Sequence, residues 1–414
     1  MFILIQHKCN ELEKICNGIE ALKELSEKTS AKVLSFGEEL SSFILFKYLN
    51  ENDVDIDHLN SKELIVANSS YLTAEVDYPA TQANISKQVG SKNYIAAGFI
   101  ASNHNNENVV LGRGGSDFSA AIYANALNAD LLEIWSDIDG VHNANPKLIK
   151  DSSAIDQMSY KEAFELAYFG AKVLYPPTIL PLMKKNIPLV VKNTANPELA
   201  GTKIGQVDVK VEDKVKGISS ITDVVILTVS GIGLSQKSGS ARKVFQLLEE
   251  ENINVILITQ NCSEQSIGIG ISKHDLDKAI ASFNRKYEHD MLAGLINPID
   301  VNKDQAIIAV VGDKMKNSIG LSAEIFSAFG ENAINITAIA QGASERNISI
   351  VINEKDESKA LNALHEKLFA NSEKDIHMFI AGTGNVGKEF LNIVDAQKAK
   401  IANDLKLNFK IVGV

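Results

Sequence analysis

Residues 224–352 contain one sequence pattern twice, at a constant spacing of 81 positions. The spacing relates Gln260 to Gln341 and Phe245 to Phe326. Each copy predicts a strand, a helix, two strands and a charged helix, which together make a βαββα unit. The predicted strands are 224–230, 254–259 and 265–271 in the first copy and 306–312, 335–340 and 347–353 in the second, with helices at 240–250 and 321–328. Because one such unit cannot bury its apolar face alone, we expect the two copies to pack together.

The composition limits the kinds of partner that the chain is expected to have. The formal net charge of −11 argues against general attraction to nucleic acid or to an anionic membrane surface. The three cysteines, Cys9, Cys16 and Cys262, form no CxxC pair, which argues against a disulfide framework or a structural zinc site. No apolar run approaches the roughly 18 residues of a membrane span. We therefore expect a cytoplasmic protein with small-molecule or protein partners.

Residues 32–204 alternate short apolar runs with amphipathic stretches, a pattern that is typical of layered α/β proteins. The apolar runs are 33–34, 64–66, 109–111, 131–135 and 188–191. Helical spacing of apolar residues predicts a helix over 160–174. Pro176 and Pro177 are expected to end it.

A glycine cluster, Gly112-Arg113-Gly114-Gly115-Ser116-Asp117, lies between an expected strand and a helix predicted to begin at Phe118. Glycines let the backbone approach a ligand closely, and a helix N-terminus offers free N–H groups and a positive dipole end. Arg113 can hold a carboxylate or phosphate through two parallel hydrogen bonds. The cluster therefore predicts an anion site. The alternative is a tight turn in which Ser116 or Asp117 caps the helix.

A polar segment follows the apolar run 131–135, at the carboxyl end of a predicted strand, where ligands of open α/β sheets bind. Its hydroxyl, carboxylate and cationic groups suit a nucleotide, whereas the alternative is a polar surface turn. The side chains concerned are Ser136, Asp137, His142 and Lys147, of which the histidine by itself is more often a surface residue. Lys172, further along, either contacts a phosphate or is an ordinary solvated helix lysine.

A second glycine turn, with Gly382, Gly384 and Gly387, follows an apolar strand predicted at 376–380. Its spacing also fits a P-loop, but Glu389 stands where a P-loop needs Ser or Thr to hold magnesium. Strand, GxGxxG and helix together fit a dinucleotide pyrophosphate site. A lone βαβ unit cannot bury both faces of its sheet, so we expect a further domain beyond Val414.

Together with Ser35-Phe36-Gly37-Glu38 and Gly98-Phe99-Ile100, these segments resemble the aspartokinases of the amino-acid kinase fold. The Ile-Thr-Gln and Ile-Ala-Gln repeats resemble the paired ACT regulatory domains of that family, and the C-terminal segment resembles the start of homoserine dehydrogenase. The resemblance to bifunctional aspartokinase/homoserine dehydrogenases covers nearly all 414 residues. It implies an α/β chain with an amino-acid kinase-like three-layer αβα sandwich at 1–205, two ACT-like ferredoxin-type βαβ regulatory domains at 206–294 and 295–372, and the first βαβ of a Rossmann domain at 373–414.

The resemblance also implies the activity, a kinase that phosphorylates L-aspartate with ATP and Mg²⁺ under control by an amino acid, with threonine the expected effector. It implies that aspartate is bound by Glu38, Phe99, Arg113 and Ser116, that Arg113 and Asp117 take part in catalysis, and that the nucleotide is bound by Ser136, Asp137, His142, Lys147 and Lys172. Gln260 and Gln341 are the expected effector anchors. Gly382, Gly384 and Gly387 would bind NAD(P) only in a full-length parent. No metal held by the protein itself is expected, and the ACT domains are expected to form a homodimer or homotetramer.

The chain departs from the family pattern in two places. His142, Asn145 and Lys147 stand where the family usually has tyrosine, aspartate and arginine. The first strand of the family carries Lys-Phe-Gly-Gly-Thr-Ser, whose lysine bridges the phosphates, and no such segment occurs between Met1 and Ser35. We therefore expect a chain that is incomplete at both ends, and we expect these residues to lack kinase activity by themselves.

Two other functions remain open. The first alternative is that the chain is only a regulatory amino-acid-binding and dimerisation module without activity of its own. The second is another amino-acid kinase that acts on glutamate or acetylglutamate, which would explain the kinase fold but not the doubled repeat. The aspartate β-carboxylate is already ionised at neutral pH, so its phosphorylation needs no general base. The lack of a convincing His/Asp dyad therefore does not count against a kinase.

Overall fold

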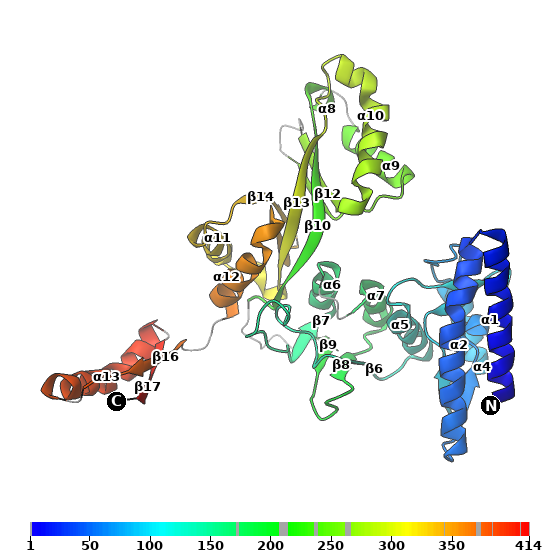
Figure 1. The fold of residues 1–414 in the computed structure, drawn as a ribbon, viewed down its shortest axis with the longest axis horizontal. Coiled ribbons are helices and arrows are strands. Elements are labelled where there is room, and N and C mark those ends of the chain that lie inside the picture. The colour runs from blue at the N-terminus through cyan, green and yellow to red at the C-terminus, as the bar shows by residue number, and fades with distance from the viewer. Residues whose placement is uncertain are drawn as a thin grey trace.

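A computed structural model describes residues 2–170, 174–206, 214–235, 239–260, 266–342, 344–369, 374–382, 384–405 and 407–413. Figure 1 shows an N-terminal half at the blue and green end of the colour scale and a pair of long strands that leave it. A small C-terminal unit is coloured red. Within the described residues, no helix combines the length and the apolar character that a bilayer crossing requires.

The N-terminal half is an α/β structure whose described strands form three separate sheets. The pair β1–β3 is parallel, β4 lies between β2 and β5, and the third sheet has the order β6-β8-β9-β7. The elements are α1 (Phe2–Leu22), α2 (Glu27–Glu51), β1 (Ile56–Leu59), α3 (Ser61–Leu64), β2 (Val66–Ala67), α4 (Tyr78–Gln88), β3 (Asn93–Ala96), β4 (Ile100–Asn103), β5 (Asn108–Val110), α5 (Gly115–Leu127), β6 (Leu132–Ser136), β7 (Gln157–Ser159), α6 (Tyr160–Tyr168), α7 (Pro176–Lys185), β8 (Leu189–Asn193) and β9 (Thr202–Gly205). Helices α5, α6 and α7 pack on the third sheet around Ile134, Leu166 and Leu189.

Three predictions about these elements were wrong. The run 33–34 lies inside α2 and not in a strand. Helix α5 begins at Gly115, three residues before Phe118, because Gly114 adopts the left-handed conformation that precedes a helix. Helix α6 ends at Tyr168, and Pro176 begins the next helix instead of ending the previous one, since proline at the first turn lacks only an N–H that has no partner there.

The repeat region folds as predicted, into two βαββα units that share one six-stranded antiparallel sheet with the order β11-β12-β10-β13-β15-β14. Its elements are β10 (Gly217–Ser230), α8 (Ile232–Ser235), α9 (Ser240–Glu250), β11 (Leu257–Gln260), β12 (Ser266–Ser272), α10 (Leu276–Leu292), β13 (Asp300–Val311), α11 (Leu321–Glu331), β14 (Ile336–Gln341), β15 (Asn347–Asn353) and α12 (Glu357–Phe369). Figure 1 shows α9 and α10 at one end of the long strands β10 and β13, and α11 and α12 at the other.

The long strands exchange halves between the two units. Residues 224–230 of β10 pair with β12 of the first unit, whereas residues 217–221 pair with β13 in the second unit. In the same way, residues 305–311 of β13 pair with β15, and its preceding residues pair with β10 in the first unit. Each unit therefore gains its fourth strand from the other.

The C-terminal segment is a small parallel βαβ unit, with β16 (Lys374–Phe379), α13 (Asn385–Leu405) and β17 (Leu407–Gly413). Gly382 has a φ of 104°, and a Cβ at Gly387 would lie 2.1 Å from the carbonyl oxygen of Gly382. The turn therefore needs glycine at both places. The assignment of this unit to a Rossmann domain, and its use of NAD(P), remain predictions.

Candidate functional site

The N-terminus of α5 has no side-chain cap. Gly114 precedes the helix with a φ of 70° and gives it no side-chain cap, so neither Ser116 nor Asp117 takes the capping role considered above. The backbone N–H groups of Ser116 and Asp117 have no hydrogen-bond partner among the described residues. Two free donors at the positive end of a 13-residue helix favour a carboxylate or a phosphate group.

Gly98 and Phe99 lie directly against this helix start. A Cβ on Gly98 would lie 2.9 Å from the Cα and 3.0 Å from the Oγ of Ser116, so position 98 has no room for a side chain. The backbone N–H of Phe99 donates to Ser119 Oγ at 2.8 Å, and Phe99 itself has a φ of 66°. The structure thus brings Phe99 and Ser116 together, as the sequence predicted for one binding site, and holds Phe99 in a strained backbone conformation.

Glu38 comes to this region on α2. Ser35, one turn earlier on the same helix, accepts a hydrogen bond from Asn108 Nδ2 at 3.1 Å, which ties α2 to β5 just before the glycine cluster. Burial raises the pKa of the Glu38 carboxyl and that of Asp117. Neither carboxylate has an ion-pair partner in the described part of the chain. Both would be stabilised in the charged form by a cationic group of a ligand.

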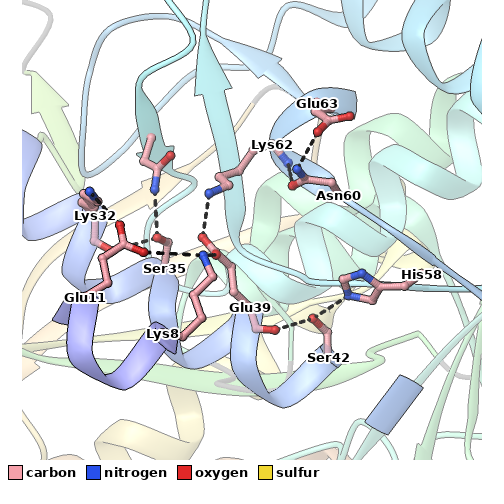
Figure 2. Close-up of polar contacts among 11 residues, drawn as sticks. Lys8, Glu11, Lys32, Ser35, Glu39, Ser42, His58, Asn60, Lys62 and Glu63 are labelled. Atoms are coloured by element: carbon pink, nitrogen blue, oxygen red, sulfur yellow. Dashed lines mark hydrogen bonds and ion pairs between the residues drawn. The ribbon is translucent and has the colours of Figure 1, made fainter. Parts of the chain in front are cut away.

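The neighbouring Glu39 has a quite different environment, which Figure 2 shows in close-up. Its carboxylate lies between Lys8, with a 3.1 Å contact, and Lys62, with a 2.8 Å contact. Burial acts to raise the pKa of Glu39, but hydrogen bonds from Lys62 and Lys8 outweigh it and lower the pKa. Two adjacent glutamates on α2 therefore differ: Glu39 is neutralised by two lysines, whereas Glu38 has no ion-pair partner among the described residues.

The carboxyl ends of β6 and β8 form the other part of the candidate site. Ser136 ends β6, its hydroxyl donates to Asp137 Oδ1 at 3.1 Å, and its backbone register partner on β8 is Asn193. Asn193 Nδ2 donates to Asp139 Oδ1 at 2.6 Å, and this hydrogen bond, with a weaker one from Asn196, lowers the pKa of Asp139. The buried Asn193 was missed by the sequence analysis, although it follows an apolar run as Ser136 does.

The helix start and these strand ends lie at one edge of the structure. Helix α5 connects to β6 through a short turn and packs against it, with Ala121 and Ala124 beside Ile134. The two elements therefore run in opposite directions, so the N-terminus of α5 and the carboxyl end of β6 point the same way. This arrangement is the one expected if Arg113, Ser116 and Asp117 share an edge with Ser136 and Asp137.

The rest of the predicted nucleotide loop contains both buried and exposed residues. His142 Nδ1 lies 3.4 Å from Ser152 Oγ, and Lys147 donates its backbone N–H to Asn145 Oδ1 at 3.0 Å while its side chain is exposed. Asn143, between them, is buried, and its carbonyl oxygen accepts the backbone N–H of Ile218 in β10 at 2.8 Å. Lys172 lies outside the described residues.

The two repeat glutamines both end edge strands. Gln341 ends β14 and lines a pocket of about 360 Å³ with Ser318, Glu345 and the first residues of α11, whose N-cap Gly320 gives no side-chain hydrogen bond. Gln260 ends β11 and is exposed, and the residues that follow it lie outside the described part. The structure thus shows a pocket beside the second glutamine.

Comparison with known proteins defines the class to which this fold belongs. Residues 6–193 match the model of the amino acid kinase family, and residues 227–287 and 308–368 each match that of the ACT domain. The chain is 36% identical over 398 residues to the bifunctional aspartokinase/homoserine dehydrogenase of Buchnera aphidicola, covering 95% of this chain and 49% of the relative. It is 37% identical over 405 residues to the enzyme of that name from Haemophilus influenzae, covering 96% of this chain and 49% of the relative. The chain thus spans about half the length of these relatives.

Solved structures agree with these matches. The E. coli aspartokinase III structure in complex with aspartate and ADP has a TM-score of 0.77 at 28% identity, covering 88% of this chain and 82% of that one. The structure of the same enzyme with lysine and aspartate has a TM-score of 0.68 at 27% identity, with the same coverage. The chain is an amino acid kinase fold followed by paired ACT domains. It belongs to the aspartokinase family.

Proposed function

We propose that these residues belong to an enzyme that phosphorylates L-aspartate with ATP under the control of an amino acid that binds to its ACT domains, and that by themselves they bind aspartate and nucleotide. The observation that carries the proposal is that an uncapped helix N-terminus, at Ser116 and Asp117, and a polar strand end, at Ser136 and Asp137, point the same way. An acidic substrate and the phosphates of a nucleotide both need hydrogen-bond donors and cationic groups, and they must bind next to each other to react. The similar E. coli aspartokinase III structure with bound aspartate and ADP supports the same assignment.

The proposed substrate end combines Arg113 with Glu38. The Arg113 guanidinium is exposed and can take up a carboxylate of aspartate through two parallel hydrogen bonds. The raised pKa of Glu38 marks a carboxylate without a counter-charge, which the substrate ammonium would supply. Phe99 and Ser116, in contact with the helix start, would complete the walls.

Phosphoryl transfer to a carboxylate depends on positioning and on charge neutralisation. The N–H groups at the start of α5 stabilise negative charge without reorganising. Among the described residues, no group of three or more His, Cys, Asp or Glu side chains is arranged to hold a metal ion. Mg²⁺ would therefore arrive with the ATP phosphates, keep several waters and use one or two carboxylates, for which Asp137 and Asp117 are placed.

The proposed regulation uses the two strand-end glutamines, with threonine as the effector and a homodimer or homotetramer formed through the ACT domains. The pocket at Gln341 supports the first part, since it joins an amide side chain to the open N-terminus of α11, which favours a carboxylate. A cytoplasmic location is part of the same proposal.

Binding of L-aspartate, measured by calorimetry with ADP present, tests the proposal. We choose binding because turnover would also require the phosphate-bridging lysine of the family, which does not occur in these 414 residues. Arg113→Ala should weaken aspartate binding by at least about tenfold, since it removes charge-assisted hydrogen bonds. The exposed Arg242 on α9 supplies the matched control, and Arg242→Ala should leave the affinity unchanged.

The alternatives give different results in the same experiment. A regulatory module would bind an effector amino acid but neither aspartate nor ADP. A kinase of another substrate class would bind glutamate or acetylglutamate in place of aspartate. Either result would contradict the proposal.

A further inference from the structure

A cavity of about 610 Å³ lies where the kinase half meets the second regulatory unit. Its walls come from four places: the loop with Asn143 and Asp156, the segment that leads into β10 with Lys214 and Lys216, helix α11 with Glu324, and the end of α12. Asn143 lies in the proposed nucleotide loop and Leu321 also lines the Gln341 pocket, but none of the cavity residues is one that we propose to hold aspartate, nucleotide or the strand-end effector. The cavity is a separate candidate site.

Lys216 is the reason to expect a ligand there. The residue is only 9% exposed, and its backbone N–H donates to Val311 at 2.7 Å. Its ammonium group has neither a hydrogen bond nor an ion pair in the part of the chain that the structure describes. The side chain is largely covered and lines the cavity, so an anionic group in the cavity would gain a charge-assisted hydrogen bond from it. Lys214, two residues earlier, adds a second positive charge to the same wall.

Two carboxylates complete the charge pattern of the cavity. Asp156 and Glu324 line it from opposite halves of the molecule, and neither has a side-chain partner within the described residues. Two lysines and two carboxylates sum to zero charge, which matches a ligand that is itself a zwitterion. A simple anion such as phosphate would satisfy the lysines and leave both carboxylates without a cation.

The remaining wall is apolar. Val215, Leu321, Leu368 and Phe369 lie beside the charged groups. Such a surface favours a ligand with an uncharged, apolar side chain, because a charged side chain would lose its hydration there. We propose that this cavity binds a free α-amino acid with an apolar side chain, its carboxylate at Lys216 and Lys214 and its ammonium at Asp156 or Glu324.

The position of the cavity gives the ligand a route to the kinase site. Asn143 lines the cavity and belongs to the proposed nucleotide loop, and its carbonyl oxygen accepts the N–H of Ile218 in the regulatory sheet. A ligand held between Asn143 and Glu324 therefore contacts both halves at their joint. Any effect of the ligand on nucleotide affinity must be matched by an equal effect of nucleotide on ligand affinity.

L-leucine is a suitable probe, because its side chain is wholly apolar. We would measure its binding by calorimetry to the 414-residue chain that carries Gln260→Ala and Gln341→Ala, which removes the proposed strand-end anchors. L-leucine should bind saturably, whereas N-acetyl-L-leucine, which lacks the ammonium, and L-leucine methyl ester, which lacks the carboxylate, should not. Lys216→Met in this background should weaken binding by at least about tenfold. Lys286→Met, at an exposed lysine of α10, is the control and should have no effect.

Thermal unfolding guards against a variant that fails to fold. Lys216→Met should keep the unfolding midpoint without ligand, since it removes no hydrogen bond or ion pair of the described residues and keeps an unbranched side chain, and it should abolish the rise that L-leucine gives. If Lys216→Met lowers the midpoint, the exposed Glu324 provides a second test. Glu324→Gln should then weaken L-leucine binding by at least about tenfold. The proposal is overturned if L-leucine does not bind, if N-acetyl-L-leucine binds equally well, or if inorganic phosphate alone binds. Because neither ATP nor aspartate is present, these outcomes do not bear on the proposed kinase activity.

Discussion

Asp223 in β10 and Asp304 in β13 stand 81 residues apart, and both adopt left-handed backbone conformations, with φ values of 56° and 53°. Each interrupts its long strand at the point where the strand passes from one regulatory unit to the other. Their partners also obey the repeat. Lys273 contacts the Asp304 carboxylate at 3.0 Å, and Glu354, 81 residues after Lys273, accepts the backbone N–H of Asp223 at 3.4 Å. The repeat is thus preserved in backbone geometry even where the side chains have opposite charges.

The same correspondence leads to a stability prediction at Ala333. This exposed alanine has a φ of 51°, and so does Asn252, its counterpart in the first unit. Asparagine tolerates the left-handed conformation, whereas alanine is strained there by roughly 1 kcal/mol. Ala333→Asn should therefore raise the free energy of unfolding by up to about 1 kcal/mol, and Asn252→Ala should lower it by a similar amount. Urea unfolding measures both, and equal effects of the same sign would contradict the explanation.

Asp117→Asn should stabilise the ligand-free protein at neutral pH. Burial raises the pKa of Asp117, so the folded state binds the proton more tightly than the unfolded state and gains stability as the pH falls. The amide removes the burial penalty of the charged form, which is complete above the pKa of the folded state and absent below that of the unfolded state. The gain in melting temperature should thus be seen near pH 7 and fade as the pH falls through that pKa. Asp137→Asn is the control, and a gain independent of pH would contradict the prediction.

Glu162 on α6 is expected to couple the kinase half to the regulatory sheet. It is buried, and its carboxylate accepts the N–H of Ser159 at 2.9 Å and that of Asp313 at 2.8 Å. Glu162→Ala leaves two donors without a partner, which should cost about 2–4 kcal/mol. Glu162→Gln keeps the shape and should cost less. Urea unfolding gives the stabilities, and a near-neutral Glu162→Ala would show that the contact is dispensable.

Threonine binding should depend on the two strand-end glutamines to different extents. Gln341 lines a formed pocket at the start of α11, so Gln341→Ala should weaken threonine binding by about tenfold. Gln260→Ala should also weaken a second binding event, as the repeat predicts. Calorimetry with threonine, and with lysine as the comparison ligand, measures both. Gln305→Ala is unsuitable as a control because Gln305 is buried, so the exposed Gln246 on α9 serves in its place.

The sequence predicted the repeat elements well because each copy carries its own alternation of apolar residues, as in 347–353. The first half of β10, residues 217–221, was missed because its pairing partner is in the other unit and its burial depends on that partner. The prolines at the start of α7 were misjudged because proline is compatible with a helix start as well as with a helix end. The hydrogen bond from the Ile218 N–H to the Asn143 carbonyl oxygen joins residues 75 positions apart. It involves backbone atoms alone, so no pattern of side chains in the sequence could predict it.

The exchange of half-strands between the regulatory units limits which domain rearrangements such a chain can tolerate in evolution. A deletion or transplant that removes one unit would leave the other with an unpaired strand edge, which is prone to aggregate. The two halves of the duplication must therefore be inherited, shuffled or engineered together. Each is nevertheless free to diverge at the residues of its own ligand pocket.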